Sequence, residues 1–454
     1  MDSALFLLLI TAVAVVLLLA LVMKFKIHAF ISLLLVSAFV GLAAGMPFDE
    51  VLTSIQEGMG GILGFIAIIV GLGTIIGKLL EVSGGAEALA RNIIQVFGEK
   101  RSTWGLALTG FIISIPVFLD VAFVILVPII YALSRKSKRS TLYYAIPLLA
   151  GLAVTHVFIP PTPGPVAVAE ILGAPLGWMI IFGVIIGLPV TFLAGPLFGK
   201  YIGSKIHIDP PDFSETAKTK APPESRWDFA VILLVILLPL VLIVMATLLD
   251  ILQTGGTLPQ EAYWIELLKF IGHPFSALAI ATLMAAWFLG YNKGFTGQEV
   301  LQFSDKALAP AGLIILVTGA GGVLKEILVD SGVGDALAAT ISAWQVLPIV
   351  LAYLLSVAVR ITQGSATVAM ITAAGLMAPL MSTFNASDPE KALVALAIAA
   401  GAIVLSHVND SGFWLVNKYL GLTEKETLQS WTVMTTIVSV AGFGMVMVLY
   451  FLFV

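Results

Sequence analysis

Apolar stretches of about twenty residues recur along the chain and are separated by short polar segments. Residues 5–23, 231–249 and 434–454, for example, contain no charged side chain. A helix of this length crosses roughly 30 Å of hydrocarbon. We therefore expect an all-α integral membrane protein. About ten spanning helices are predicted, at residues 3–23, 28–45, 60–78, 142–174, 176–198, 229–251, 267–290, 307–324, 392–420 and 431–453.

Two further apolar stretches, residues 104–133 and 344–384, are expected to form re-entrant hairpins. Lysines and arginines flank the first stretch at both ends, so the positive-inside rule places both ends in the cytoplasm. A single span cannot begin and end on one side, whereas a hairpin can, and Pro116 would break the helix near its tip. The second stretch has mainly acidic flanks and a polar middle at residues 360–367, which predicts a hairpin entered from the outside.

The chain also contains an internal duplication. Residues 71–90 and 319–338 agree at eight of twenty positions without a gap. Residues 155–157 (Thr-His-Val) and 406–408 (Ser-His-Val) match at nearly the same separation. A steady separation over about ninety residues indicates two copies of one ancestral unit.

The two copies are predicted to have opposite orientations in the membrane. Each holds three spans, a hairpin, a broken helix and a final span, but the first starts outside and the second inside. We expect inverted repeats at residues 1–201 and 228–454, joined by a cytoplasmic linker at 202–227. The broken helices are residues 142–174 and 392–420. Secondary transporters follow this plan, with their sites near the midplane at discontinuous helices.

Composition and charge support a membrane protein and set its predicted orientation. Charged residues make up 11% of the chain, whereas soluble domains carry roughly 25%. With both termini outside, the cytoplasmic segments hold 19 of the 23 lysines and arginines, which predicts a multi-pass protein of the bacterial inner membrane. The chain has no cysteine, which excludes disulfides and thiolate metal sites, and we expect no metal. No basic stripe with interleaved aromatic residues suggests nucleic acid as a partner.

Polar residues interrupt the apolar stretches at the two hairpin tips and in the two broken helices. A half-helix that begins at such a break points its N-terminal amides at the midplane, where an anion is favoured. Ionisable residues at that depth are functional candidates. The predicted substrate-binding residues are Ser114, Asp120, Thr155, His156, Thr162, Gly164, Arg360, Gln363, Gly364, Ser365, Thr367, Ser406, Asn409, Asp410 and Ser411. The candidates for carrying a coupling proton are Asp120, His156, His407 and Asp410.

Each ionisable candidate also has a structural interpretation. Asp120 and Asp410 could cap the half-helices that follow them. His156 and His407 could bond free carbonyls at helix ends. Arg360 could pair with an acidic residue rather than with the carboxylate of a substrate.

Several of these segments resemble the gluconate permease family of proton symporters. The resemblance rests on residues 155–165 (THVFIPPTPGP), 363–369 (QGSATVA) and 406–414 (SHVNDSGFW), together with Lys24-Phe25-Lys26 and Gly84-Gly85-Ala86, and it runs from end to end. Family members carry glutamate at the first hairpin tip, where this chain has Asp120. The resemblance implies a homodimer of inverted repeats with an elevator-type mechanism, and gluconate, another sugar acid or D-serine as substrate.

The sequence leaves three functional hypotheses. The first is a proton-coupled secondary transporter of gluconate or a related sugar acid, with no cofactor beyond the coupling H⁺. The second is a sodium-coupled carrier of another small carboxylate or of D-serine on the same fold, because unwound carbonyls could also bind Na⁺. The third is a membrane-embedded hydrolase. It is disfavoured because the sequence has no His-Glu-x-x-His helix and no converging catalytic triad, so we expect no catalytic residue and no enzyme.

Overall fold

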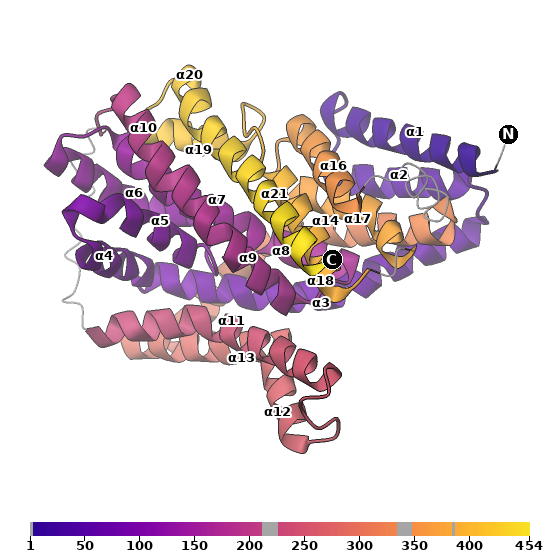
Figure 1. The fold of residues 1–454 in the computed structure, drawn as a ribbon, viewed down its shortest axis with the longest axis horizontal. Coiled ribbons are helices and arrows are strands. Elements are labelled where there is room, and N and C mark those ends of the chain that lie inside the picture. The colour runs from indigo at the N-terminus through magenta and orange to yellow at the C-terminus, as the bar shows by residue number, and fades with distance from the viewer. Residues whose placement is uncertain (1–2, 211–225, 334–346, 384–385) are drawn as a thin grey trace.

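A computed structural model describes residues 3–210, 226–333, 347–383 and 386–454, and all regular structure in these ranges is helical. Most of the predicted linker and the beginning and last residue of the predicted second hairpin, at residues 344–346 and 384, lie outside the described residues. Figure 1 shows an elongated bundle in which the long helix α3 runs through the middle of the molecule.

In the first part of the chain, the helices are α1 Ser3–Met23, α2 Ala29–Ala43, α3 Phe48–Val82, α4 Gly85–Phe97, α5 Ser102–Ile113, α6 Leu119–Ser137, α7 Thr141–Phe158, α8 Pro163–Leu172, α9 Leu176–Phe192 and α10 Phe198–Lys205. In the second part, they are α11 Arg226–Thr254, α12 Tyr263–Gly272, α13 Pro274–Ala285, α14 Gly297–Asp330, α16 Pro348–Gln363, α17 Ala366–Thr383, α18 Asp388–Ala402, α19 Ser411–Leu420, α20 Glu424–Thr427 and α21 Val433–Phe453. Short π-helical turns at Leu193–Leu197, Ala286–Gly290 and Leu428–Thr432 join neighbouring helices.

Seven helical segments of the described chain are long and apolar enough to cross a membrane. They are Phe48–Val82, Thr141–Leu172, Leu176–Lys205, Phe229–Thr254, Pro274–Lys293, Gly297–Asp330 and Glu424–Phe453. The protein is therefore a multi-pass membrane protein. The other predicted spans, at residues 3–23, 28–45 and 392–420, fall on α1, on the 15-residue helix α2 and on the interrupted helices α18 and α19, so the full count of ten stays a prediction.

One predicted span begins at the wrong residue. The sequence pattern predicts a continuous helix over residues 267–290, but the structure divides it between α12 and α13 at His273. Pro274 has no amide hydrogen and occupies the first position of α13, where none is needed. The spanning segment therefore starts at Pro274, and α12 projects from the body beside the end of α11 (Figure 1).

The first hairpin stretch is interrupted at residues 114–118, between α5 and α6, and both helices pack along α7. Its two flanks lie together, because the ammonium group of Lys136 in the last turn of α6 pairs with the carboxylate of Glu99 before α5. In the second stretch, α16 and α17 are separated only by residues 364–365, and both pack along α18. The chain therefore reverses at both predicted tips.

Helix ends recur at nearly the same separation in the two parts of the chain. His28 and His273 each accept a hydrogen bond from the backbone amide two residues later, at 3.2 and 3.3 Å. Glycines with matching positive φ follow corresponding helices. Gly84 after α3 and Gly332 after α14 both have φ 71°, and Gly173 after α8 and Gly421 after α19 both have φ 65°. These matched ends support the predicted duplication, while the opposite orientation of the copies and their boundaries stay predictions.

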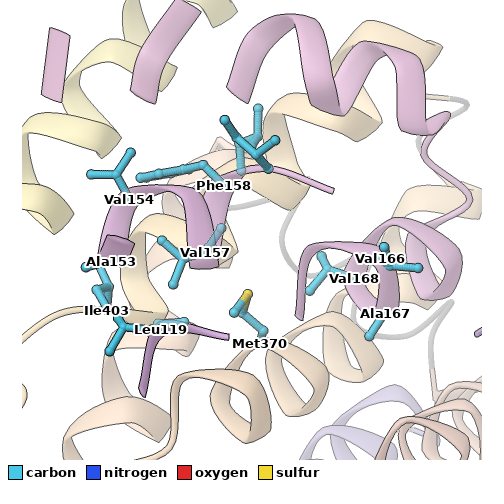
Figure 2. Close-up of a cluster of buried hydrophobic side chains, with 14 of the residues drawn as sticks. Leu119, Ala153, Val154, Val157, Phe158, Val166, Ala167, Val168, Met370 and Ile403 are labelled. Atoms are coloured by element: carbon cyan, nitrogen blue, oxygen red, sulfur yellow. The ribbon is translucent and has the colours of Figure 1, made fainter. Parts of the chain in front are cut away.

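A cluster of buried apolar side chains lies next to the helix interruptions. Figure 2 shows Val157 and Phe158 of α7, Val168 of α8 and Met370 of α17 in one cluster, and each of these side chains is fully buried. Helices do not associate in lipid by a hydrophobic effect, so close packing of this kind stabilises the bundle. It fixes the half-helices from the two parts of the chain against each other.

Candidate functional site

Four interruptions bring the polar candidates together. They lie between α5 and α6, α7 and α8, α16 and α17, and α18 and α19. The half-helices that follow them pack in pairs across the two parts of the chain, α8 against α17 and α6 against α19. Gly164, in the first turn of α8, lies against Met370 and Thr367 in the first turns of α17, where a Cβ would come within 2.4 Å of the Met370 methyl carbon.

An ion pair between Arg360 and Asp410 joins the second hairpin tip to the second broken helix. Arg360 Nη2 donates to Asp410 Oδ2 at 2.5 Å, and the side chains are 1% and 14% exposed. Arg360 also donates through Nε to the Val404 carbonyl at 3.3 Å and through Nη1 to the Gly364 carbonyl. The guanidinium is therefore occupied by protein groups in this conformation, which fits the structural interpretation of Arg360.

Asp410 is the centre of a larger hydrogen-bond network. Its Oδ1 accepts from the Gly412 amide at 3.0 Å and caps α19, as the structural interpretation proposed. Its Oδ2 also accepts from the Ser406 hydroxyl. Trp431 Nε1 donates to that hydroxyl at 2.6 Å, and Thr432 Oγ1 donates to the Ser406 carbonyl.

Sequence reasoning missed Trp431 and Thr432. They stand at the start of the last predicted span, where tryptophan is typical of the membrane–water interface. The structure instead buries Trp431 in the π-helical turn Leu428–Thr432, which turns its indole towards Ser406. π-helical turns often occur at functional sites, but they have no reliable signature in a single sequence.

The second tip is tied to the broken helix by further hydrogen bonds. His407 Nε2 lies 3.1 Å from the Ile361 carbonyl and donates to it, and Asn409 Nδ2 donates to the same carbonyl at 3.1 Å. Gly364 has φ +79°, and a Cβ there would lie 2.3 Å from the Asn409 carbonyl oxygen. His407 therefore bonds a carbonyl at a helix end, as its structural interpretation proposed. Ser365 Oγ accepts from the Val368 amide at 3.4 Å at the start of α17.

Three hydroxyl candidates in the first part of the chain bond nearby backbone. Ser114 donates to the Val117 carbonyl at 3.3 Å, Thr155 to the Phe111 carbonyl at 2.8 Å and Thr162 to the Ile159 carbonyl at 2.6 Å. These bonds hold the tip of the first hairpin and the proline-rich break in shape.

The half-helices α6 and α8 begin without a side-chain cap. The side chains of their N-cap residues, Phe118 and Thr162, accept no hydrogen bond from the first turn, although their backbone carbonyls accept from the Ala122 and Val166 amides. Asp120 lies in the first turn of α6 and is exposed, and it is not the cap that the structural interpretation proposed. The first amides of α6 therefore remain able to bind an anion, whereas α8, which begins Pro163-Gly164-Pro165, offers only the Gly164 amide because proline has no N–H.

Two polar candidates have buried atoms that lack hydrogen-bond partners among the described residues. These atoms are Nδ1 of His156 and both amide atoms of Gln363. The charged groups that act on His156 are Asp120, Asp410 and Arg360, which puts the first broken helix in electrostatic reach of both hairpin tips. Because buried polar atoms normally have partners, water or a ligand is expected to supply them here.

Asp120, Asn409 and Ser411 are exposed, and they form the accessible part of the candidate site. Among the described residues, no group of three His, Asp or Glu side chains could hold a metal ion. The arrangement combines exposed carboxylate and amide groups, two uncapped helix ends and a partly buried imidazole. Such a set can bind a polar organic anion and exchange a proton with it.

Comparisons with known proteins agree with this architecture. The chain is 39% identical over 450 residues to the gluconate permease of Pseudomonas aeruginosa, covering 99% of this chain and 98% of that protein. It is 41% identical to the low-affinity gluconate transporter of Escherichia coli K12, covering 96% of each chain. It is 38% identical to the Gnt-II system L-idonate transporter of the same organism, covering 96% and 97%.

The fold is similar to the crystal structure of the YdaH transporter of Alcanivorax borkumensis, with a TM-score of 0.64 over 93% of this chain and 98% of that one. At 16% identity this likeness concerns the fold alone. The relatives are permeases and transporters, so the protein is not an enzyme. The sequence also matches the family described as GntP family permease over residues 6–452. This chain belongs to the GntP family of permeases.

Proposed function

We propose that this protein is a secondary active transporter that imports gluconate or a closely related sugar acid with protons across the bacterial inner membrane. The observation that carries the proposal is the end-to-end similarity, at 39–41% identity, to proteins named as gluconate permease and gluconate transporter. The arrangement of charged groups and uncapped helix ends at the four interruptions supports it.

In this proposal, the substrate carboxylate binds at the uncapped N-terminus of α6 and at the Gly164 amide of α8. The predicted ligands Gln363 and Thr367 are placed to bond hydroxyl groups, since the Gln363 amide has no partner among the described residues. Asn409 and Ser411 line the exposed side of the site. An uncharged hydroxyl-rich chain beside a carboxylate matches this mixture of anion-binding and polar groups.

Asp120 and His156 are the proposed proton carriers. Asp410 is held by Arg360, Ser406 and the Gly412 amide, and His407 is held by the Ile361 carbonyl, so neither is as free to exchange a proton in this conformation. Asp120 is exposed and acts electrostatically on His156. Neutralising a carboxylate at membrane depth lowers the cost of moving the site across.

We further propose an elevator-type movement in a homodimer with both termini outside. The long helices α3 and α14 pack against each other and would form the fixed part. The hairpins and broken helices would move as one body, because α5 and α6 pack on α7 and α16 and α17 pack on α18.

The test is uptake of labelled gluconate into proteoliposomes of the purified protein under an imposed pH gradient, with L-idonate and D-serine as competitors. Accumulation that depends on the pH gradient and is indifferent to sodium supports the proposal. Dependence on a sodium gradient at fixed pH would favour sodium coupling. Absence of transport of any sugar acid would contradict the proposed function.

A further inference from the structure

A cavity of about 120 Å³ lies between the first hairpin tip and the long helices α3 and α14. Its walls include Phe118 and Val121 at the start of α6, Lys78 and Glu81 of α3, and Lys306 and Pro310 of α14. Positive-inside analysis puts both lysines on the predicted cytoplasmic side. We call this cavity the α3–α14 vestibule.

The two lysines of the vestibule differ in their surroundings. Lys78 Nζ lies 2.6 Å from Glu81 Oε1, so its charge is balanced locally. Lys306 is exposed, and within the described ranges its ammonium has no ion pair or hydrogen bond. The vestibule therefore presents one unbalanced positive charge to an entering solute.

The vestibule continues inwards towards the candidate site. A smaller cavity shares Thr74, Pro116, Val117 and Phe118 with it and reaches Thr162 at the uncapped start of α8. The first hairpin tip and Thr74 of α3 therefore form the wall that the vestibule shares with the cavity at the broken helix.

We propose that the α3–α14 vestibule is a second, weak binding site for the transported organic carboxylate, with Lys306 as its cation. The inference rests on the proposed function. An ammonium group is a compact charge that attracts a carboxylate without demanding one orientation, which suits a site that a solute enters and leaves quickly. A single exposed cation also makes binding there sensitive to salt.

The experiment measures the gluconate KM separately at each face of oriented proteoliposomes, for the wild type, Lys306→Gln and Lys306→Arg. We expect Lys306→Gln to raise the KM at the vestibule face about five-fold, the size of one exposed charge interaction, and to leave the KM at the opposite face unchanged. Lys306→Arg should restore the wild-type value, and high salt should remove the difference between the wild type and Lys306→Gln.

Lys205→Gln is the matched control, because Lys205 is an exposed lysine on the same predicted face at the end of α10, away from the vestibule. An unchanged KM in Lys306→Gln, an equal change at both faces, or the same change in Lys205→Gln would overturn the inference and leave the proposed function standing. A wild type that transports no sugar acid would overturn both.

Discussion

The Arg360–Asp410 pair shows how individual residues hold the second hairpin tip. Both side chains are nearly buried, and between them they bond the tip, the break and the first turn of α19. A buried ion pair adds little stability compared with an apolar pair, but the loss of one partner leaves the other charge uncompensated.

We therefore predict that Asp410→Asn lowers the free energy of unfolding by about 3 kcal/mol, because Arg360 would remain buried without its counter-ion. Arg360→Met should have a similar effect, and the double variant should lose less than the sum of the single variants. Thermal unfolding of the purified protein in detergent measures all three. Additive losses would show that the pair does not act as a unit.

At the first tip we predict that Asp120→Asn abolishes accumulation driven by a pH gradient but retains gluconate exchange. Exchange needs only binding and movement of the loaded site, whereas accumulation also needs release of a proton. Both are measured in the same proteoliposomes. Asp49→Asn is the control, because Asp49 is also an exposed carboxylate in the first turn of a helix, α3. Full accumulation by Asp120→Asn would remove Asp120 from the proton pathway.

At the scale of elements, the first hairpin tip packs closely against α3. Gly77 faces the tip, and a Cβ there would lie 2.2 Å from the Pro116 carbonyl oxygen. Gly73, one turn earlier, faces Pro161 of the proline-rich break. These two glycines have the GxxxG spacing that is typical of helix–helix packing. In the structure, however, they contact two loops and not another helix.

Gly77→Ala is accordingly expected to push the tip away from α3 and to lower both transport and stability, by about 1–3 kcal/mol for a forced close contact. Gly64→Ala on the same helix is the matched control, since nothing lies within 4 Å of its Cβ position. That change should be neutral or stabilising by up to about 1 kcal/mol, because alanine favours a helix. Uptake and thermal unfolding measure both variants. Equal effects of Gly77→Ala and Gly64→Ala on uptake and unfolding would contradict a close contact between the first hairpin tip and α3.

The sequence predicts the four interruptions well because proline, glycine and charged residues are conspicuous within apolar stretches. The breaks at residues 114–118 and 364–365 fall at the predicted tips. The partners of the polar groups are less predictable, because they depend on contacts between distant segments. Nothing local shows that Arg360 is saturated by Asp410 and two carbonyls, or that Trp431 turns inwards to Ser406.

For the whole molecule, the central hypothesis is that each hairpin enters and leaves the membrane on one side. The pairing of Lys136 with Glu99 brings the two ends of the first hairpin together. The pair is exposed and contributes little stability, so it shows that the two ends are close but does not hold them together.

The natural absence of cysteine makes this arrangement directly testable by labelling single-cysteine variants in intact cells. We predict that Lys100→Cys and Lys136→Cys react only with a membrane-permeant maleimide, because both flanks are expected in the cytoplasm. Ser204→Cys, at the exposed end of α10 and of the last span of the first repeat, should behave in the same way. Thr257→Cys, exposed between α11 and α12, should also react with an impermeant reagent because it is expected outside. If positions 100 and 136 differed in their reactivity, residues 104–133 would cross the membrane once. Every later segment would then change sides, and the two repeats could no longer be inverted.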